Sequence, residues 1–587
     1  MESGKVEVVA NGVAASPGIA MGGATVVARA EMRVPKRRLL PEEVDKEITR
    51  LLKAIEDTKA QLAAVRDQVA EEMGESYARI FDAHIMILED RASVDEVVTG
   101  VRAWNNAESS VNAVFSKLER QMWEKGDVYI KDRAADIRDV RVRVLSNLIG
   151  AGGPARVPSD LGDDVIVIAH DLSPADTAQM RKWKVKAFAT DVGGRTSHTA
   201  IMARSLEIPA VVGLNNVTAK IQDEDFVIVD GNRGKVIVSP SQATLERYSR
   251  EVQRYASFTK GLLQFKDLPA VTVDGRSIML SANIESHEEV DSVLEHGAQG
   301  IGLYRTEFIY IGRRGLPTED EQQVIYRSVA DKVSPHPVII RTMDLGGDKF
   351  LSEFESPKEM NPYLGWRGIR FCLARPDIFK TQLRAILRAS AKGNVKIMYP
   401  MISNLDELIQ ANAVLDEAKR ELEVEGQAFD RECEVGIMVE TPAAVMIARE
   451  LARHVDFFSI GSNDLIQYAL AADRGNEKVA YLYEPLHLAV LRFINQTVET
   501  AKETGIWVGL CGEMSSDLAS AFVLLGMGID ELSTSPYVVP QIKEMVRSVA
   551  FSDAQAVARE ALTISDPAEI RRRATEAIAK TLPEMLL

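Results

Sequence analysis

Apolar residues, with one threonine among them, recur at alternating steps of four and three early in the chain. They are Val44, Ile48, Leu51, Ile55, Thr58, Leu62, Val65 and Val69. This spacing puts the side chains on one stripe of a helix and predicts a coiled-coil-like seam. Pro41 suits the first position of that helix. We expect further helix to about Leu148, so that residues 36–149 form a helical hairpin or small bundle, with breaks near Gly74, Gly100 and Gly126.

Shorter apolar runs on both sides of this helical block are typical of β-strands. They are Val6–Val9, Ser16–Ala20, Val165–Ala169, Ala187–Thr190, Ala210–Gly213, Phe226–Val229 and Lys235–Val238. The last two runs flank Asp230–Gly234, which predicts a hairpin. We therefore expect one β/α domain, made of residues 1–35 and 150–243, into which the helical block is inserted. A polar helix from about Thr244 to Lys266 predicts a linker over residues 244–268.

Eight apolar runs, with helical segments between them, follow in residues 269–587. They are Ile278–Asn283, Gly300–Tyr304, Val338–Thr342, Lys396–Pro400, Glu434–Val439, Phe457–Ile460, Trp507–Cys511 and Glu531–Thr534. Eight strand–helix units are typical of a (β/α)₈ barrel of the TIM type, which builds its active site at the carboxyl ends of its strands. The pattern alone leaves an open, doubly wound sheet as the alternative. The chain is thus expected to be an α/β multidomain protein.

Composition and charge narrow the class of protein. The 587 residues suffice for about three or four domains. The net charge of −16 argues against a general nucleic-acid or anionic-membrane partner and suits docking of a basic protein. The three cysteines are widely spaced, which argues against a disulfide framework. Because no apolar stretch approaches membrane-spanning length and no signal-peptide core follows Met1, we expect a cytoplasmic enzyme without membrane insertion.

The run from Gly193 to Arg204 is the most informative motif. Gly193 and Gly194 allow a tight turn, and the polar residues after them open a helix, so free backbone N–H groups gather where an anion binds. His198 lies in the first turn of that helix. Its imidazole can attack phosphorus and carry a phosphoryl group, and Arg195 can pair with the phosphate oxygens. A histidine that merely caps a helix is the alternative.

Arginines follow the ends of the predicted barrel strands. Arg305 and Arg341 end the second and third strands, and Arg367 and Arg474 lie in later loops. A single arginine at a strand end most often makes a surface salt bridge. If several converge on one barrel mouth, they form an anion-binding pocket suited to a phosphate and a carboxylate.

Two carboxylates and a thiol follow other barrel strands. Glu440 ends the fifth strand and Asp464 follows the sixth, and two hard oxygen ligands beside substrate phosphate and water are how proteins usually hold Mg²⁺. Structural ion pairs with the arginines are the alternative. Cys511 ends the seventh strand and can donate a proton to an enolate carbon, unless it is a buried structural cysteine like Cys372 and Cys433.

Together these motifs resemble enzyme I of the bacterial sugar phosphotransferase system, the phosphoenolpyruvate–protein phosphotransferase family. The resemblance covers nearly the whole chain. Besides the histidine turn and the barrel motifs, it includes Ala15–Ala20 and His84–Asp90. Ser462 and Ile466 are small departures, at positions where the family has threonine usually and often, respectively. Neither departure removes a charge from the predicted site.

The resemblance implies a fold and a reaction. It implies a swivelling β/α domain that carries the phosphohistidine, a helical insert that docks the carrier protein HPr, and a barrel that binds phosphoenolpyruvate and Mg²⁺ and forms a homodimer. The residues that match family positions are His198 as phosphoryl acceptor, Thr177 as the residue that holds its ring, Arg305, Arg341, Asn463 and Arg474 as substrate ligands, Glu440 and Asp464 as metal ligands, and Cys511 as the acid that yields pyruvate. The implied role is the first step of sugar uptake.

Two rival functions and one rival branch remain. The related pyruvate phosphate dikinase and phosphoenolpyruvate synthase enzymes need a separate nucleotide-binding domain, and the chain has no phosphate-cradling Gly-rich Lys-Ser/Thr loop. A regulatory scaffold that binds the carrier without catalysis would not need the histidine, arginines, carboxylates and cysteine. Members of the nitrogen-regulatory branch commonly add an N-terminal sensory domain, whereas this chain begins with the histidine-carrying domain, which favours the sugar-uptake branch.

Overall fold

The protein is described by a computed structural model. The described residues are 7–27, 34–73, 75–124, 128–150, 165–172, 176–177, 180, 185–194, 198–206, 208–310, 315–346, 361–474, 476 and 478–583. The chain divides into two compact units, Met1–Phe258 and Thr259–Leu587.

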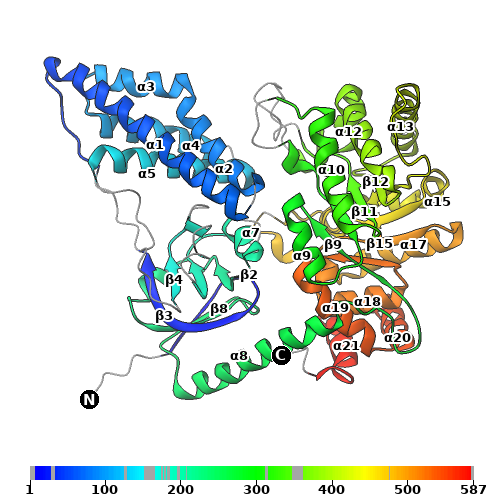
Figure 1. Cartoon of the computed structure of the whole chain (residues 1–587). Helices are drawn as coiled ribbons and strands as arrows, with labels where there is room; N and C mark the ends of the chain where they lie inside the picture. The colour runs from blue at the N-terminus through cyan, green and yellow to red at the C-terminus, as the bar shows by residue number, and fades with distance from the viewer. Residues whose placement is uncertain are drawn as a thin grey trace. The chain divides into compact units, whose positions relative to one another are not determined.

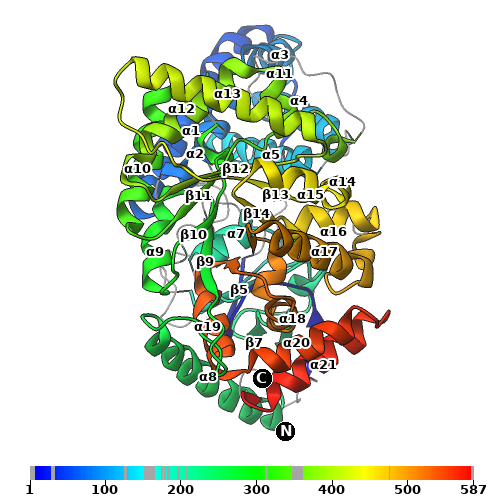
Figure 2. The same ribbon diagram turned by 90° about the vertical axis from the view of Figure 1, so that its right-hand side faces the viewer.

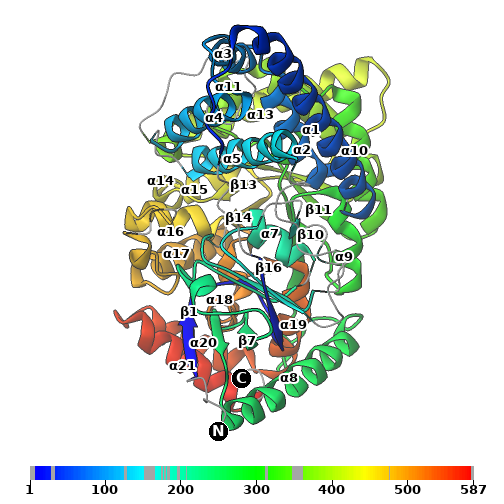
Figure 3. The same cartoon turned by 90° about the vertical axis from the view of Figure 1, so that its left-hand side faces the viewer.

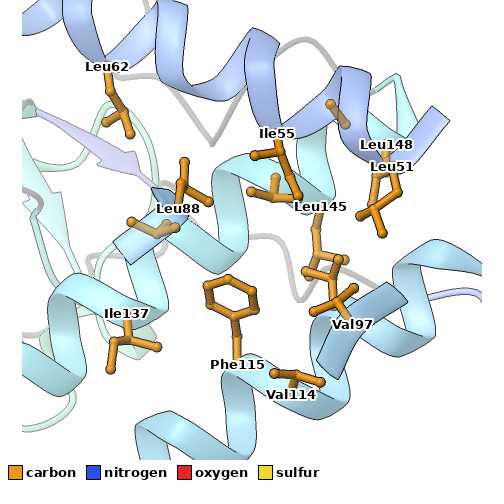
Figure 4. Packing of buried hydrophobic residues seen from close by; sticks show 14 of the residues in the cluster. Leu51, Ile55, Leu62, Leu88, Val97, Val114, Phe115, Ile137, Leu145 and Leu148 are labelled. Atoms are coloured by element: carbon orange, nitrogen blue, oxygen red, sulfur yellow. The ribbon is translucent and has the colours of Figure 1, made fainter. Parts of the chain in front are cut away.

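Helices α1 to α5 form a bundle in the first unit (Figure 1). They are α1 (Val44–Met73), preceded by a 3-10 turn at Pro41–Glu43, α2 (Glu75–Glu89), α3 (Arg91–Arg102), α4 (Ala107–Glu124) and α5 (Val128–Ile149). Leu51, Ile55 and Leu62 of the predicted seam are buried in one cluster with Leu88 of α2 and Leu145 of α5 (Figure 4). The predicted apolar seam of α1 is therefore confirmed.

The expected helix break near Gly100 is confirmed, because α3 ends at Arg102 and α4 begins at Ala107. Gly100 itself still lies inside α3. A Cβ atom at position 100 would lie 2.9 Å from the Ser110 hydroxyl of α4. Glycine there serves the close packing of α3 on α4 and does not itself end the helix. Gly74 and Gly126 are outside the described residues.

The sheet of the first unit has the order β1-β8-β7-β3-β4-β5-β6-β2. Its strands are β1 (Val8–Asn11), β2 (Val13–Ser16), β3 (Ile19–Val27), β4 (Ile166–Ala169), β5 (Ala187–Thr190), β6 (Ala210–Val212), β7 (Phe226–Asp230) and β8 (Lys235–Val238). Strands β3 to β6 are parallel neighbours, and β7 and β8 form the predicted hairpin. The carboxyl ends of β4 and β5 therefore share one edge, where the loops toward Thr177 and toward α7 (His198–Ser205) begin.

Helix α8 (Gln242–Leu262) is the predicted polar helix, and it crosses the boundary between the two units. Its N-terminal half lies against the β7–β8 hairpin (Figure 3). Leu245 and Tyr248 of α8 pack there on Ile228 and Ile237. A 3-10 turn at Leu263–Phe265 follows.

Eight parallel strands close into a barrel in the second unit, in the order β10-β11-β12-β13-β14-β15-β16-β9. They are β9 (Met279–Ile284), β10 (Ile301–Tyr304), β11 (Val338–Arg341), β12 (Val395–Tyr399), β13 (Val435–Val439), β14 (Phe457–Ile460), β15 (Trp507–Leu510) and β16 (Glu531–Thr534). The predicted barrel is confirmed, and the open sheet is excluded.

Helices surround these strands (Figure 2). They are α9 (Val290–Glu295), α10 (Glu319–Val333), α11 (Ile369–Ala374), α12 (Pro376–Ala389), α13 (Leu405–Val424), α14 (Pro442–Met446), α15 (Ala448–Leu451), α16 (Ser462–Leu470), α17 (Leu488–Thr504), α18 (Leu518–Met527), α19 (Val539–Ser548), α20 (Phe551–Ala561) and α21 (Pro567–Ala579). Helices α18 and α20 pack closely at Gly526, where a Cβ atom would lie 2.0 Å from the Ala554 carbonyl oxygen. Among the described helices, none combines the length and the apolar character that a membrane crossing requires.

Candidate active site

The polar side chains singled out in the barrel sequence stand directly after its strands. Arg305 follows β10, Arg341 ends β11, Glu440 follows β13, Asp464 lies in the first turn of α16 after β14, and Cys511 follows β15. Because the strands of a closed parallel barrel end at one mouth, the fold brings these side chains together.

Arg341 is held between two carboxylates. Its Nη2 donates to Glu307 Oε1 at 2.9 Å, and its Nη1 pairs with Asp344 Oδ2 at 3.0 Å. Burial disfavours the charged guanidinium, but Glu307, Asp344 and Glu440 hold the pKa of Arg341 above its ordinary value. The Arg341 Nε–H is buried and has no hydrogen-bond partner within the described residues. One donor of this fixed guanidinium is therefore left for a ligand.

Arg367 binds the same Asp344 through two hydrogen bonds. Its Nε donates to Oδ1 at 3.2 Å, and its Nη2 donates to Oδ2 at 2.8 Å. That Nη2 also lies 3.7 Å from Asp464 Oδ2, and Nη2 of Arg474 lies 3.9 Å from Asp464 Oδ1. Charges of alternating sign thus run from Arg341 through Asp344, Arg367 and Asp464 to Arg474.

The arginines differ in how far solvent reaches them. The side chain of Arg341 is 10% exposed, whereas those of Arg305 and Arg474 are 33% and 32% exposed. Arg305 pairs with Glu285, which follows β9. The site therefore combines fixed, buried arginines with others that an entering anion can reach directly.

Glu440 is a buried carboxylate beside other acidic groups. Among the described residues, no basic side chain comes within 4.0 Å of it, and its Oε1 accepts a hydrogen bond from the Met401 backbone N–H at 2.6 Å. Burial, together with the charges of Asp464 and Asp344, raises the pKa of Glu440 well above its ordinary value.

Glu440 and Asp464 fit a divalent cation. A buried carboxylate that lacks an ion pair and faces a second carboxylate is a setting that a cation stabilises, and carboxylate oxygens are ligands that Mg²⁺ prefers. No group of three or more His, Cys, Asp and Glu side chains in the described parts of the chain is arranged to hold a metal. The protein would thus supply two ligands and leave the other positions to substrate and water.

The Cys511 thiol is buried at the same mouth. Burial raises its pKa to about 11, although the nearby charges of Arg341 and Arg305 oppose this shift and that of Glu440 adds to it. The thiol therefore stays protonated at neutral pH, as an acid must. Cys372 and Cys433 are also buried, which agrees with the structural role predicted for them.

Asn463 precedes Asp464 in the first turn of α16. Its side-chain Oδ1 accepts a hydrogen bond from the Glu513 backbone N–H at 2.9 Å, which ties α16 to the segment after Cys511. Its backbone carbonyl accepts from the Tyr483 hydroxyl at 3.3 Å. The amide NH₂ of Asn463 is the part of the side chain left to meet a substrate oxygen.

The predicted phosphoryl acceptor lies in the first unit. His198 is the first residue of α7, at the edge where β4 and β5 end. The next residue, Thr199, donates from its hydroxyl to the Leu172 carbonyl at 3.1 Å, which ties α7 to the loop after β4. Thr177, which follows that loop in a helical segment, is buried. Arg195 and the side chain of His198 lie outside what the structure describes, so their predicted roles stay predictions.

Sequence reasoning missed the carboxylates that position the arginines. Arg305 donates to Glu285, Arg341 to Glu307, and Arg367 to Asp344. Asp344 carries a signal in the sequence, because it follows its second partner, Arg341, by three residues. A second missed pair lies at the carboxyl ends of β4 and β5. His170 Nδ1 is 3.2 Å from Asp191 Oδ2, and the two residues directly follow the neighbouring strands β4 and β5.

The similarity of this chain to known proteins extends over nearly its whole length. Three families match it, described as the N-terminal, mobile and PEP-binding domains of PEP-utilising enzymes, at residues 11–133, 161–234 and 259–551. A phosphoenolpyruvate-protein phosphotransferase of Priestia megaterium is 45% identical over 95% of this chain and 97% of that protein.

A second relative carries the same name as the first. The phosphoenolpyruvate-protein phosphotransferase of Bacillus subtilis is 44% identical over 95% of this chain and 98% of that protein. A solution structure of an Enzyme I protein is 43% identical, covers 42% of this chain and 99% of its own, and has a TM-score of 0.37.

Proposed function

The chain belongs to the family of phosphoenolpyruvate-protein phosphotransferases, and from that premise we propose that it transfers the phosphoryl group of phosphoenolpyruvate to its own His198. From there the group passes to a histidine of an HPr-type carrier protein, as the first step of sugar uptake. The observation that carries the proposal is the buried cluster of arginines, carboxylates and one thiol at the barrel mouth, where an anionic substrate can meet both a metal site and an acid.

Phosphoenolpyruvate carries a phosphate and a carboxylate, and both suit arginine donors. Arg341 and Arg367 supply positive charge that Asp344 has already fixed in place. Arg305 and Arg474, which are more exposed, close on the anion as it enters, and the amide of Asn463 orients it. Charge that is in place before the reaction needs no rearrangement when the transition state forms.

Glu440 and Asp464 are the residues that would hold Mg²⁺, with substrate and water as its other ligands. When bound, the ion supplies positive charge beside the phosphate while the phosphoryl group leaves. The raised pKa of Glu440 supports this assignment, because burial and the nearby charges of Asp464 and Asp344 destabilise its carboxylate, and a bound cation would offset both effects.

The transfer itself balances with the residues present. The Nε2 atom of His198 attacks phosphorus, and the bond between phosphorus and the enol oxygen breaks. Its electron pair stays on the departing enolate, whose terminal carbon takes the proton of the Cys511 thiol to give pyruvate. The Cys511 thiolate then regains a proton from water. Thr177 holds the other ring nitrogen of His198, and Arg195 contacts the transferred phosphate.

The phosphohistidine must then reach the carrier. We propose that the carrier binds to the helical insert, residues 36–149. The domain of residues 1–35 and 150–243 would then move between the carrier and the barrel, with the linker 244–268 as its hinge. The net charge of −16 supports a basic carrier. We further propose that the protein works in the cytoplasm as a homodimer joined through residues 269–587.

Pyruvate release tests this proposal. The full chain with phosphoenolpyruvate, Mg²⁺ and an HPr-type carrier should release one pyruvate for each carrier that gains a phosphate, and His198→Ala should stop both. Transfer to the carrier by the His198→Ala variant would refute the assignment. Labelling by ATP in place of phosphoenolpyruvate would instead indicate a dikinase-like enzyme.

A further inference from the structure

Asp344 stands between two arginines of the barrel mouth. Its side chain is 2% exposed, its Oδ2 lies 3.0 Å from Arg341 Nη1 and 2.8 Å from Arg367 Nη2, and its Oδ1 accepts from Arg367 Nε at 3.2 Å. One buried carboxylate is thus shared by two guanidinium groups. Such an arrangement is stable only while all its members are present.

The two arginines differ in what they would do without Asp344. Arg341 keeps a second carboxylate partner in Glu307, at 2.9 Å. For Arg367, Asp464 is the one other carboxylate within 4.0 Å among the described residues, and its Oδ2 lies 3.7 Å from the same Nη2 that now binds Asp344. A movement of about 1 Å would bring Arg367 and Asp464 to the distance of a charge-assisted hydrogen bond.

We propose that Asp344 is a positioning residue that keeps Arg367 off Asp464 and so leaves that carboxylate free to bind a divalent cation. The inference rests on the proposed assignment of Asp464 as a metal ligand. Asp344 acts through Arg367 and does not itself touch the ion. Its charge is essential, because an amide in its place accepts a hydrogen bond but supplies no negative charge to hold Arg367.

Binding of Mn²⁺ to the full chain without phosphoenolpyruvate tests the inference, by calorimetry or by the electron paramagnetic resonance of the free ion. The Asp344→Asn variant should bind Mn²⁺ about 10- to 100-fold more weakly, the usual effect of losing a residue that positions a metal ligand. Asp344→Asn combined with Arg367→Gln should regain most of the affinity, because no arginine is then left to occupy Asp464.

This double variant separates the inference from its alternatives. If Asp344 were itself a metal ligand or only a packing residue, removal of Arg367 would not restore binding, and the inference would be overturned. Unchanged Mn²⁺ affinity in Asp344→Asn would overturn it as well. An Asp464→Asn variant that binds Mn²⁺ like the wild type would refute the proposed metal site together with the inference, whereas weakened binding in Asp464→Asn upholds the site whatever Asp344→Asn does.

A surface pair of the same geometry provides the control. Arg375 binds Asp377 through two hydrogen bonds of 2.9 Å and 2.7 Å, but the Asp377 side chain is 63% exposed. Asp377→Asn should leave Mn²⁺ affinity unchanged. If Asp344→Asn does not fold, the Arg367→Gln variant alone tests the inference. It should bind Mn²⁺ at least as tightly as the wild type. Binding that is weakened threefold or more would overturn the inference.

Discussion

Replacement of Arg341 by methionine should destabilise the barrel far more than replacement of Arg305. Arg341 is 10% exposed and lies between Glu307 and Asp344, so Arg341→Met leaves buried negative charge without its partner. Removal of one member of a buried ion pair costs about 3–5 kcal/mol. The Arg305 side chain is 33% exposed, and a pair of that kind contributes about 1 kcal/mol or less.

Scanning calorimetry measures this difference. A globular protein gains about 2 cal/mol/K of entropy per residue on unfolding, so a barrel of about 330 residues gains about 0.7 kcal/mol/K. The Tm of the barrel transition should therefore fall by about 4–7 °C in Arg341→Met and by less than about 2 °C in Arg305→Met. Equal shifts in the two variants would refute the argument that burial of the pair governs its contribution.

Further predictions concern a thiol, a lysine and a glycine. Because the pKa of Cys511 is raised to about 11, the thiol should resist iodoacetamide at pH 8 in the folded protein and react after denaturation, and fast native alkylation seen by mass spectrometry would contradict this. Cys511→Ser should lower the rate of pyruvate release in a quenched-flow assay by about 10²-fold or more, the range of general acid catalysis, and a smaller loss argues against its role as the acid. Lys543 is buried and its pKa is lowered to about 8, so between pH 8 and its ordinary 10.5 the unfolded chain binds the extra proton. Chemical unfolding should therefore show the wild type gaining stability relative to Lys543→Met as pH rises through this range, by up to about 3 kcal/mol, and a loss would refute the sign. Gly526→Ala should destabilise the barrel by about 1–3 kcal/mol because its Cβ atom would meet the Ala554 carbonyl oxygen, whereas Gly23→Ala, with no atom within 4 Å, should have little effect on Tm.

The fold of the barrel was largely predictable from the sequence. The runs Phe457–Ile460 and Glu531–Thr534 are strands with the same bounds in the structure, and the other barrel strands agree within one residue at each end. Strands buried on both faces form largely apolar runs that can be recognised in a sequence. Gly100 shows the limit of such reasoning. A glycine that ends a helix and one that allows close helix packing look alike in a sequence, and the Ser110 contact that decides between them comes from a different helix.

The candidate site was predictable in its parts but not in its connections. Arg341 and Arg367 were identified because they follow strands or lie in polar loops of the barrel. Their shared partner Asp344 was not, because its pairing with Arg367, which lies 23 residues further along the chain, is not visible in the sequence. His170 and Asp191 were missed for a similar reason, since their contact needs the pairing of β4 with β5. Sequence spacing indicates which residues share a barrel mouth, whereas the geometry decides which charge offsets which.

The measurement that tests the central claim most directly is the mapping of phosphate on the full chain after incubation with labelled phosphoenolpyruvate and Mg²⁺. The account predicts one acid-labile, base-stable phosphate on His198 that passes to an HPr-type carrier when the carrier is added. Label on another residue, or none on a folded protein supplied with Mg²⁺, would contradict it.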